Sequence, residues 1–219
     1  MDVFASGRID ARFFAPRIQV LLDLLSADGR TVADLADPRR EKFRPEGCAT
    51  FNYIEISDID GAGAATSKSL ACVDAPSRAT WHVREGDIIT SAVRPIRRLS
   101  AQVAPEQDGF VCSSGFVVVK PRDITPEVLL TYLRLPVICE LLDLYASASM
   151  YPAITDADIF NLPLPLITDA VGEYVRRNVI AANVAKADAS HLLETAKRAV
   201  ETAIEDGESA AMIYLDQAE

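Results

Sequence analysis

Three arginines lie within five positions of the chain, at Arg94, Arg97 and Arg98. A guanidinium group can donate two parallel hydrogen bonds to O6 and N7 of guanine, or to a phosphate. Because Pro95 keeps Arg94 out of a helix, we expect these side chains on an extended loop between two strands. The alternative is a solvated loop with surface ion pairs, and residue types alone favour that alternative.

A second basic group precedes them and comprises Arg39, Arg40, Lys42 and Arg44. Such a group can clamp a phosphate, although a charge run of this kind is more often a solvated face. Lys68 follows a glycine-rich segment and can contact a phosphate through that loop. The segment lacks the Gly-x-x-x-x-Gly-Lys pattern, so the signal at Lys68 is weak.

Catalytic residue patterns are missing from the sequence. His82 and His191 are the only histidines, and there is no Ser/His/Asp set, Gly-x-Ser-x-Gly or His-Glu-x-x-His motif. Residues 161–164 superficially resemble the Asn-Pro-Pro-aromatic motif of adenine methyltransferases but lack its second proline and its aromatic residue. We therefore expect a protein with no enzymatic activity of its own.

The four cysteines, Cys48, Cys72, Cys112 and Cys139, are far apart and form no Cys-x-x-Cys pair. We expect no metal site and no disulfide framework, but buried reduced thiols in a cytoplasmic protein. No apolar run approaches the roughly 20 residues that span a bilayer, so no membrane association is expected.

The net charge of −10 argues against tight, non-specific binding to nucleic acid. Half of this charge lies in the last quarter of the chain. Residues 1–167 carry 17 basic and 22 acidic residues, and residues 168–219 carry 5 and 10. Local basic clusters in the longer part can still attract phosphate.

Hydrophobic periodicity and turn residues predict the elements that position these clusters. Helices are predicted at 16–26, after the Thr31-x-x-Asp34 capping box, at 125–134, from Pro136 to Tyr145 and after Thr155. Strands are predicted at 51–57, 79–84, 87–93 and 110–120. The continuously apolar end of the last strand, Phe116–Val119, indicates burial on both faces.

Two prolines in Leu162–Leu166 predict an extended boundary, which divides the chain into a domain at 1–167, a long helix at 168–206 and a flexible tail at 207–219. The helix has an apolar stripe at heptad spacing, interrupted by one lysine. The stripe comprises Val175, Val179, Ala182, Lys186, Ala189, Leu193, Ala196, Val200 and Ala203. A helix of about 55 Å needs a partner to cover such a stripe.

Six segments, taken in order, resemble one half of a type I restriction-modification specificity subunit. They are Arg8–Phe14 with Pro16, Tyr53–Ile59, Gly86–Pro95 with Ser113–Phe116, Tyr132–Leu133 with Pro136, Tyr151–Asp156, and Asn161–Pro165. The long helix resembles the spacer helix of that family. The resemblance implies an α+β fold, in which a mixed α/β target recognition domain precedes a long C-terminal spacer helix.

The resemblance also implies that the protein recognises one half-site of double-stranded DNA and docks a DNA methyltransferase subunit. S-adenosylmethionine is then expected only on that partner subunit. Because only one recognition domain and one helix are present, we expect a homodimer through the stripe and a palindromic, interrupted site. Two alternatives remain: an interaction protein that docks a methyltransferase without recognising DNA, and a recognition domain that accompanies a fused methyltransferase.

Overall fold

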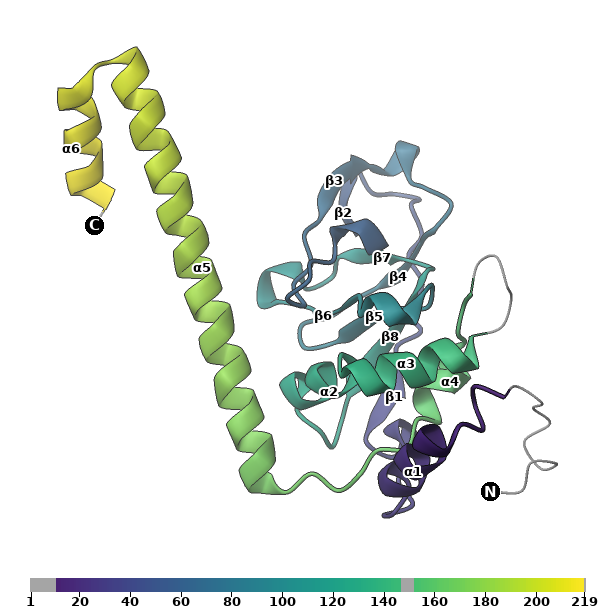
Figure 1. Ribbon diagram of the computed structural model, residues 1–219. Coiled ribbons are helices and arrows are strands. Elements are labelled where there is room, and N and C mark those ends of the chain that lie inside the picture. The colour runs from purple at the N-terminus through teal and green to yellow at the C-terminus, as the bar shows by residue number, and fades with distance from the viewer. Residues whose placement is uncertain (1–10, 147–151, 219) are drawn as a thin grey trace. The chain divides into compact units, whose positions relative to one another are not determined.

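The computed structural model describes residues 11–146 and 152–218, which form two compact units at 1–172 and 173–219 (Figure 1). Two of the family-like segments extend beyond this description, since Arg8–Asp10 and Tyr151 lie outside it. The first unit contains two four-stranded sheets with helices, and the second contains helices alone. The predicted fold class, a mixed α/β domain followed by a long C-terminal helix, is confirmed.

The first sheet is antiparallel and has the order β1-β8-β5-β6. Its strands are β1 (Ala36–Pro38), β5 (Ile88–Ser91), β6 (Ser100–Gln102) and β8 (Phe116–Pro121). Successive side chains of a strand point to opposite faces, so β8 contributes to two cores. Val117 and Val119 pack with the helices, while Phe116 and Val118 pack with the second sheet. Burial on both faces is thus confirmed.

The second sheet has the order β3-β2-β7-β4, and its β2 and β7 strands are parallel. The strands are β2 (Thr50–Ile54), β3 (Lys68–Ala71), β4 (Ala79–His82) and β7 (Val111–Ser113). The prediction of one strand at 110–120 is wrong, because the chain leaves this sheet after Ser113 and enters the first sheet at Phe116. Glycine at position 115 lets the backbone pass close to the side chain of Ile56 between the two strands, since a Cβ there would lie 2.7 Å from Cδ1 of Ile56.

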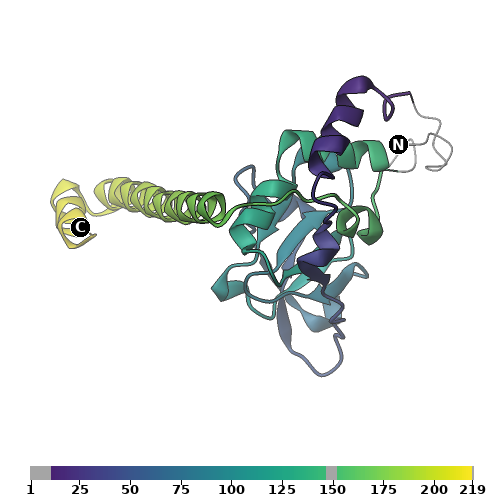
Figure 2. The ribbon, with the colours of Figure 1, turned by 90° about the horizontal axis from the view of Figure 1, so that it is seen from below.

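Four helices cover the first sheet: α1 (Pro16–Leu25), α2 (Pro126–Leu133), α3 (Pro136–Tyr145) and α4 (Asp156–Phe160). The first three begin with proline, whose missing N–H costs nothing in a first helical turn. α4 begins at the predicted capping box of Thr155 and Asp158. α2 packs on β5 and β6, and α3 lies beside α2 (Figure 2). These predicted helix starts are confirmed.

Cys48 and Cys72 form a disulfide, with their Cα atoms 6.0 Å apart, so the prediction of four reduced thiols is wrong. The pairing of β2 with β3 aligns Thr50 with Ala71 and thereby brings the two cysteines together. Closing this 24-residue separation stabilises the fold by about 3 kcal/mol in the chain-entropy account. Cys112 and Cys139 are buried free thiols, and burial raises the pKa of Cys139 to about 11.

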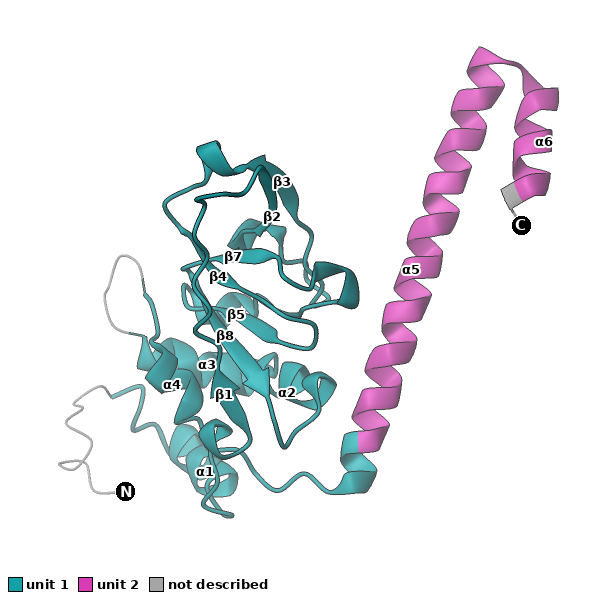
Figure 3. Ribbon diagram, turned by 180° about the vertical axis from the view of Figure 1, so that it is seen from behind, with its two compact units in different colours: residues 1–172 teal, residues 173–219 magenta. Residues whose placement is uncertain are grey.

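The second unit consists of α5 (Asp169–Glu205), which starts at the end of the first unit, and α6 (Glu208–Ala218) (Figure 3). Residues 208–218, predicted as a flexible tail, are therefore helical. Gly207 adopts a left-handed conformation with φ +94°, which allows the chain to reverse between the helices. α6 folds back on α5, where Ala199 and Ala211 are buried. No helix in the described ranges is long and apolar enough to span a bilayer.

Candidate nucleic-acid interface

Arg94, Arg97 and Arg98 lie on a tight turn between β5 and β6. The prediction of an extended loop is wrong, because Pro95–Arg97 form one turn of 3-10 helix. Arg94 and Arg98 flank it in the left-handed region, with φ of 51° and 57°. A non-glycine residue in this region is strained by about 1–3 kcal/mol and persists only where its surroundings hold it.

Neighbouring segments hold the start of this turn by main-chain hydrogen bonds. The Arg94 amide donates to the Pro152 carbonyl at 3.0 Å, and Val93 forms an isolated bridge with Ala153. Pro95 is buried, and the turn packs against α3. The backbone of the turn is therefore fixed in the unliganded protein, and binding would not have to order it.

The three arginine side chains are exposed. Among residues 11–146 and 152–218, no carboxylate forms an ion pair with Arg94, Arg97 or Arg98. Ion pairing is common elsewhere on this unit, where Arg17, Arg84 and Arg122 each pair with a carboxylate. The turn is therefore a concentrated, uncompensated positive charge on a protein whose net charge is −10.

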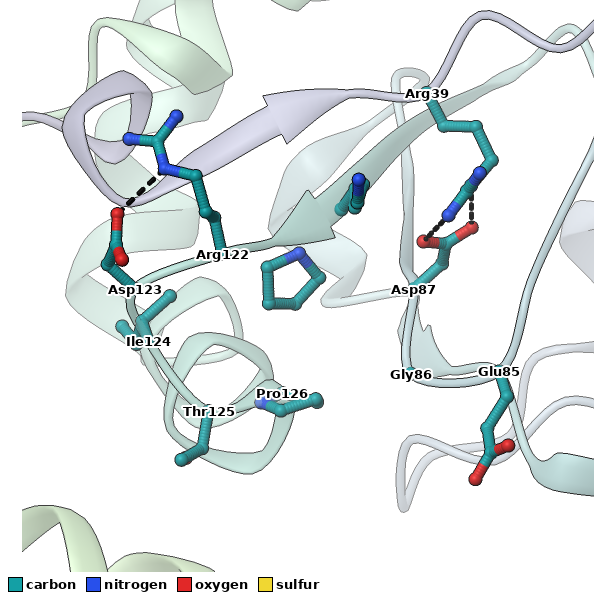
Figure 4. A pocket seen from close by; sticks show the side chains of 11 residues that line it. Arg39, Glu85, Gly86, Asp87, Arg122, Asp123, Ile124, Thr125 and Pro126 are labelled. Carbon is teal, nitrogen blue, oxygen red and sulfur yellow. Dashed lines mark hydrogen bonds and ion pairs between the residues drawn. The ribbon is translucent and has the colours of Figure 1, made fainter.

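Arg39 is placed differently from the arginines of the turn. Its guanidinium forms two hydrogen bonds with the carboxylate of Asp87, which is only 1% exposed (Figure 4). Asp87 also accepts a hydrogen bond from the Arg84 amide at 2.9 Å. The pair lines a cleft of about 540 Å³ that also contains Lys120 and Arg122. Arg39 is thus engaged in linking the end of β1 to the start of β5.

The other predicted contacts fall into two groups. Arg40 pairs with Asp156 of α4 and lies over the ring of Trp81, and Lys68 pairs with Glu55 and Asp58. Hydrogen bonding to Asp58 raises the pKa of Lys68. Lys42 and Arg44, by contrast, are exposed beside the edge of the second sheet, where Lys42 forms a bridge with Trp81.

Replacing Arg39 with alanine is expected to destabilise the fold by about 3 kcal/mol, because it leaves the Asp87 charge buried without its partner. The matched control, Arg44→Ala, removes an exposed arginine and should change the unfolding free energy by no more than about 0.5 kcal/mol. Urea titrations followed by circular dichroism measure both values. Equal stability of the two variants would contradict a structural role for Arg39.

Two further arginines were not singled out from the sequence. Arg134, at the end of α2, contacts the basic turn through main-chain oxygens. Arg78 lines a pocket of about 190 Å³ together with Tyr53 and Ser113. Only the non-local pairing of strands brings these residues together, so no local pattern could have indicated them. In the described part of the chain, no cluster of acidic, histidine or cysteine side chains could hold a metal ion.

No protein-family model and no curated protein matches this sequence. Solved structures do match. The HsdS subunit from Thermoanaerobacter tengcongensis has a TM-score of 0.59 and 29% sequence identity, over 80% of this chain and 46% of that chain. This chain is similar to that subunit over most of its length. A second solved chain also matches. It comes from a structure on the complex assembly and conformational transition of the type I R-M system, and it has a TM-score of 0.60 and 29% identity over 78% of this chain and 45% of that chain.

This chain spans less than half the length of either solved chain, 46% and 45% respectively. Its described part contains one mixed α/β domain and one long helix. The resemblance to type I specificity subunits, predicted from six degenerate segments, is confirmed by the structural similarity.

Proposed function

We propose that this chain is the DNA-recognition subunit of a restriction-modification complex, and that it recognises one half-site and docks a methyltransferase subunit. The observation that carries the proposal is the exposed turn of Arg94, Arg97 and Arg98, held on a fixed backbone and without an acidic partner among the described residues. The similarity to HsdS supports the same role for the domain that presents this turn.

The chemistry of the turn fits recognition of base edges or phosphates. Each guanidinium can donate to guanine O6 and N7, and its rigid fork loses little freedom on binding. The chain itself supplies no catalytic group in this proposal. The partner methyltransferase binds S-adenosylmethionine and extrudes the target adenine from the duplex, while this subunit determines where that happens.

The acidic remainder of the protein contributes to selectivity in this proposal. Because non-specific affinity comes from phosphate neutralisation, a protein of net charge −10 binds random duplex weakly. Contacts at the basic turn then determine which sites are occupied. Of the remaining predicted DNA contacts, Lys42 and Arg44 are exposed and suited to phosphate, while Arg39, Arg40 and Lys68 are held in ion pairs.

A second copy of the chain is the proposed partner of α5. Leu193 and Val200 in the stripe are 59% and 60% exposed. α6 buries Ala199, which lies outside the stripe, and leaves Leu193 and Val200 exposed. Antiparallel packing of two stripes would create a two-fold dimer with two recognition domains, and such symmetry predicts a palindromic, interrupted DNA site. The small alanines permit close approach, and Lys186 would fix the register.

Methylation mapping tests the proposal directly. Cells that express the chain together with its methyltransferase subunit should methylate adenine within one split, palindromic motif. Cells that express the methyltransferase subunit alone are the control and should lack this motif. The same motif in both cultures would overturn the recognition role.

The acidic charge and the ion-paired state of Arg39, Arg40 and Lys68 favour one alternative. In that alternative, the chain docks a methyltransferase without recognising DNA. Co-purification of the two proteins without any methylated motif in the mapping experiment would support it. A recognition domain that serves a fused methyltransferase remains the third candidate, and the neighbouring genes decide it.

A further inference from the structure

Arg134 connects the end of the basic turn to two other segments. Its guanidinium donates hydrogen bonds to the main-chain oxygens of Arg98 and Ser100, each at 2.9 Å. A third bond, at 2.5 Å, reaches the carbonyl of Gly61 in the loop before β3. One side chain at the C-terminal end of α2 thus joins the left-handed end of the turn, the first residue of β6 and a loop of the second sheet.

The environment of Arg134 differs from that of a solvated surface arginine. Desolvation, followed by the charge of Arg98, lowers the pKa of Arg134, while the Asp60 carboxylate acts in the opposite direction. Its three hydrogen-bond acceptors are main-chain oxygens, so its hydrogen bonds fix backbone positions. Such charge-assisted bonds are stronger than neutral ones, and here they hold Arg98 where its backbone is strained.

Gly63 packs against the guanidinium of Arg134. It has φ +95°, and a Cβ at this position would lie 3.3 Å from Nε of Arg134. Gly61 in the same loop has open space at its own Cβ position. The loop therefore restricts Arg134 through Gly63, and an alanine there would push the guanidinium away from the turn.

We infer that Arg134 is a positioning residue for DNA recognition, which fixes the left-handed end of the Arg94–Arg98 turn and makes no contact with DNA itself. This inference rests on the proposed function. Loss of the three bonds frees Arg98 to relax toward ordinary backbone angles and changes the direction of the neighbouring arginine side chains. Misplacement of contact groups by such small shifts weakens recognition strongly.

A double-mutant cycle tests the inference with the full chain in complex with the methyltransferase subunit, using a duplex that contains the mapped motif. Arg134→Met should weaken binding by about 10- to 100-fold. In a background where Arg94, Arg97 and Arg98 are alanine, the same change should have less than about a twofold effect. Independent, additive losses would overturn the inference.

Two further measurements separate positioning from direct contact. If Arg134 neutralised a phosphate, its replacement would lower the slope of log K against log salt by about one. We expect an unchanged slope. Arg134→Lys should bind as weakly as Arg134→Met, because one ammonium group cannot reproduce the fork in which Nη1 donates to Arg98 and Ser100 and Nη2 donates to Gly61. Full rescue by lysine, or a reduced slope, would contradict the inference.

A glycine substitution provides a test that retains the arginine. Gly63→Ala should weaken specific binding, while the matched control Gly29→Ala, also at a positive φ but with open space at its Cβ position, should bind normally. If Gly63→Ala does not fold, the cycle at Arg134 still decides the inference. If the triple alanine variant binds as tightly as the unaltered chain, the proposed role of the turn fails. If that variant is defective but Arg134→Met binds normally, only the present inference fails.

Discussion

Replacing Arg94, Arg97 and Arg98 together with alanine is expected to lower the affinity of the complex for its methylation motif by about 1,000-fold or more. Each well-placed arginine contact contributes about 1–3 kcal/mol, so three together contribute about 3–9 kcal/mol, and the middle of this range exceeds the ~4 kcal/mol of a 1,000-fold change. The melting temperature should change little, because these side chains form no ion pair in the described part of the chain. Fluorescence anisotropy at fixed salt measures the affinity, and calorimetry measures the melting temperature.

A charge-matched variant controls for the loss of three positive charges. Arg17, Arg84 and Arg122 are exposed, ion-paired arginines on the same unit. Their joint replacement with alanine changes the net charge equally, and exposed ion pairs contribute little to stability. Specific binding should be largely retained. If both triple variants lose affinity equally, the effect is one of net charge and the turn is not the recognition element.

The double variant Leu193→Glu with Val200→Glu is expected to convert the proposed dimer to monomer. In a two-fold interface each substitution occurs twice, so four carboxylates would enter the apolar contact between the stripes. Burying even one unpaired charge costs several kcal/mol, and the dissociation constant should therefore rise by at least about 1,000-fold. Sedimentation velocity over a range of concentrations measures the change.

The matched control uses the same residue types at other positions of α5. Leu192 and Val184 are 67% and 56% exposed and lie outside the stripe. Leu192→Glu with Val184→Glu should leave the dimer intact. An unaltered chain that sediments as a monomer at every concentration would disprove the homodimer itself.

Local chemistry made the helix starts predictable. Proline at Pro126 and Pro136, and the capping box at Thr155, act within one turn of the chain, so no distant contact was needed to recognise them. The run Phe116–Val119 was equally informative, since only a strand with two buried faces tolerates it. The division of residues 110–120 between two sheets depended on which strands pair across the sequence, and no local pattern encodes that.

The candidate site was also only partly predictable, because local sequence does not show which side chains pair in the fold. Arg39 and Arg94 are the same residue type in similarly basic surroundings, and both were predicted to contact DNA. Asp87 lies opposite Arg39 across 48 positions of sequence, and no carboxylate of the described residues pairs with Arg94. The disulfide also depended on tertiary pairing, because the β2–β3 ladder brought Cys48 close to Cys72. Residue type indicated the chemistry, but tertiary pairing decided which residues are available for it.

The position of β8 between two cores has a consequence for how target preference can evolve. A substitution on β8, such as one at Val118 or Val119, alters the packing of one core and shifts the strand that also supports the other. Arg97 and Ile96, at the tip of the turn, belong to neither core. Under the proposed function, variation at the tip would therefore change the DNA target, while the residues of the two cores would stay the same.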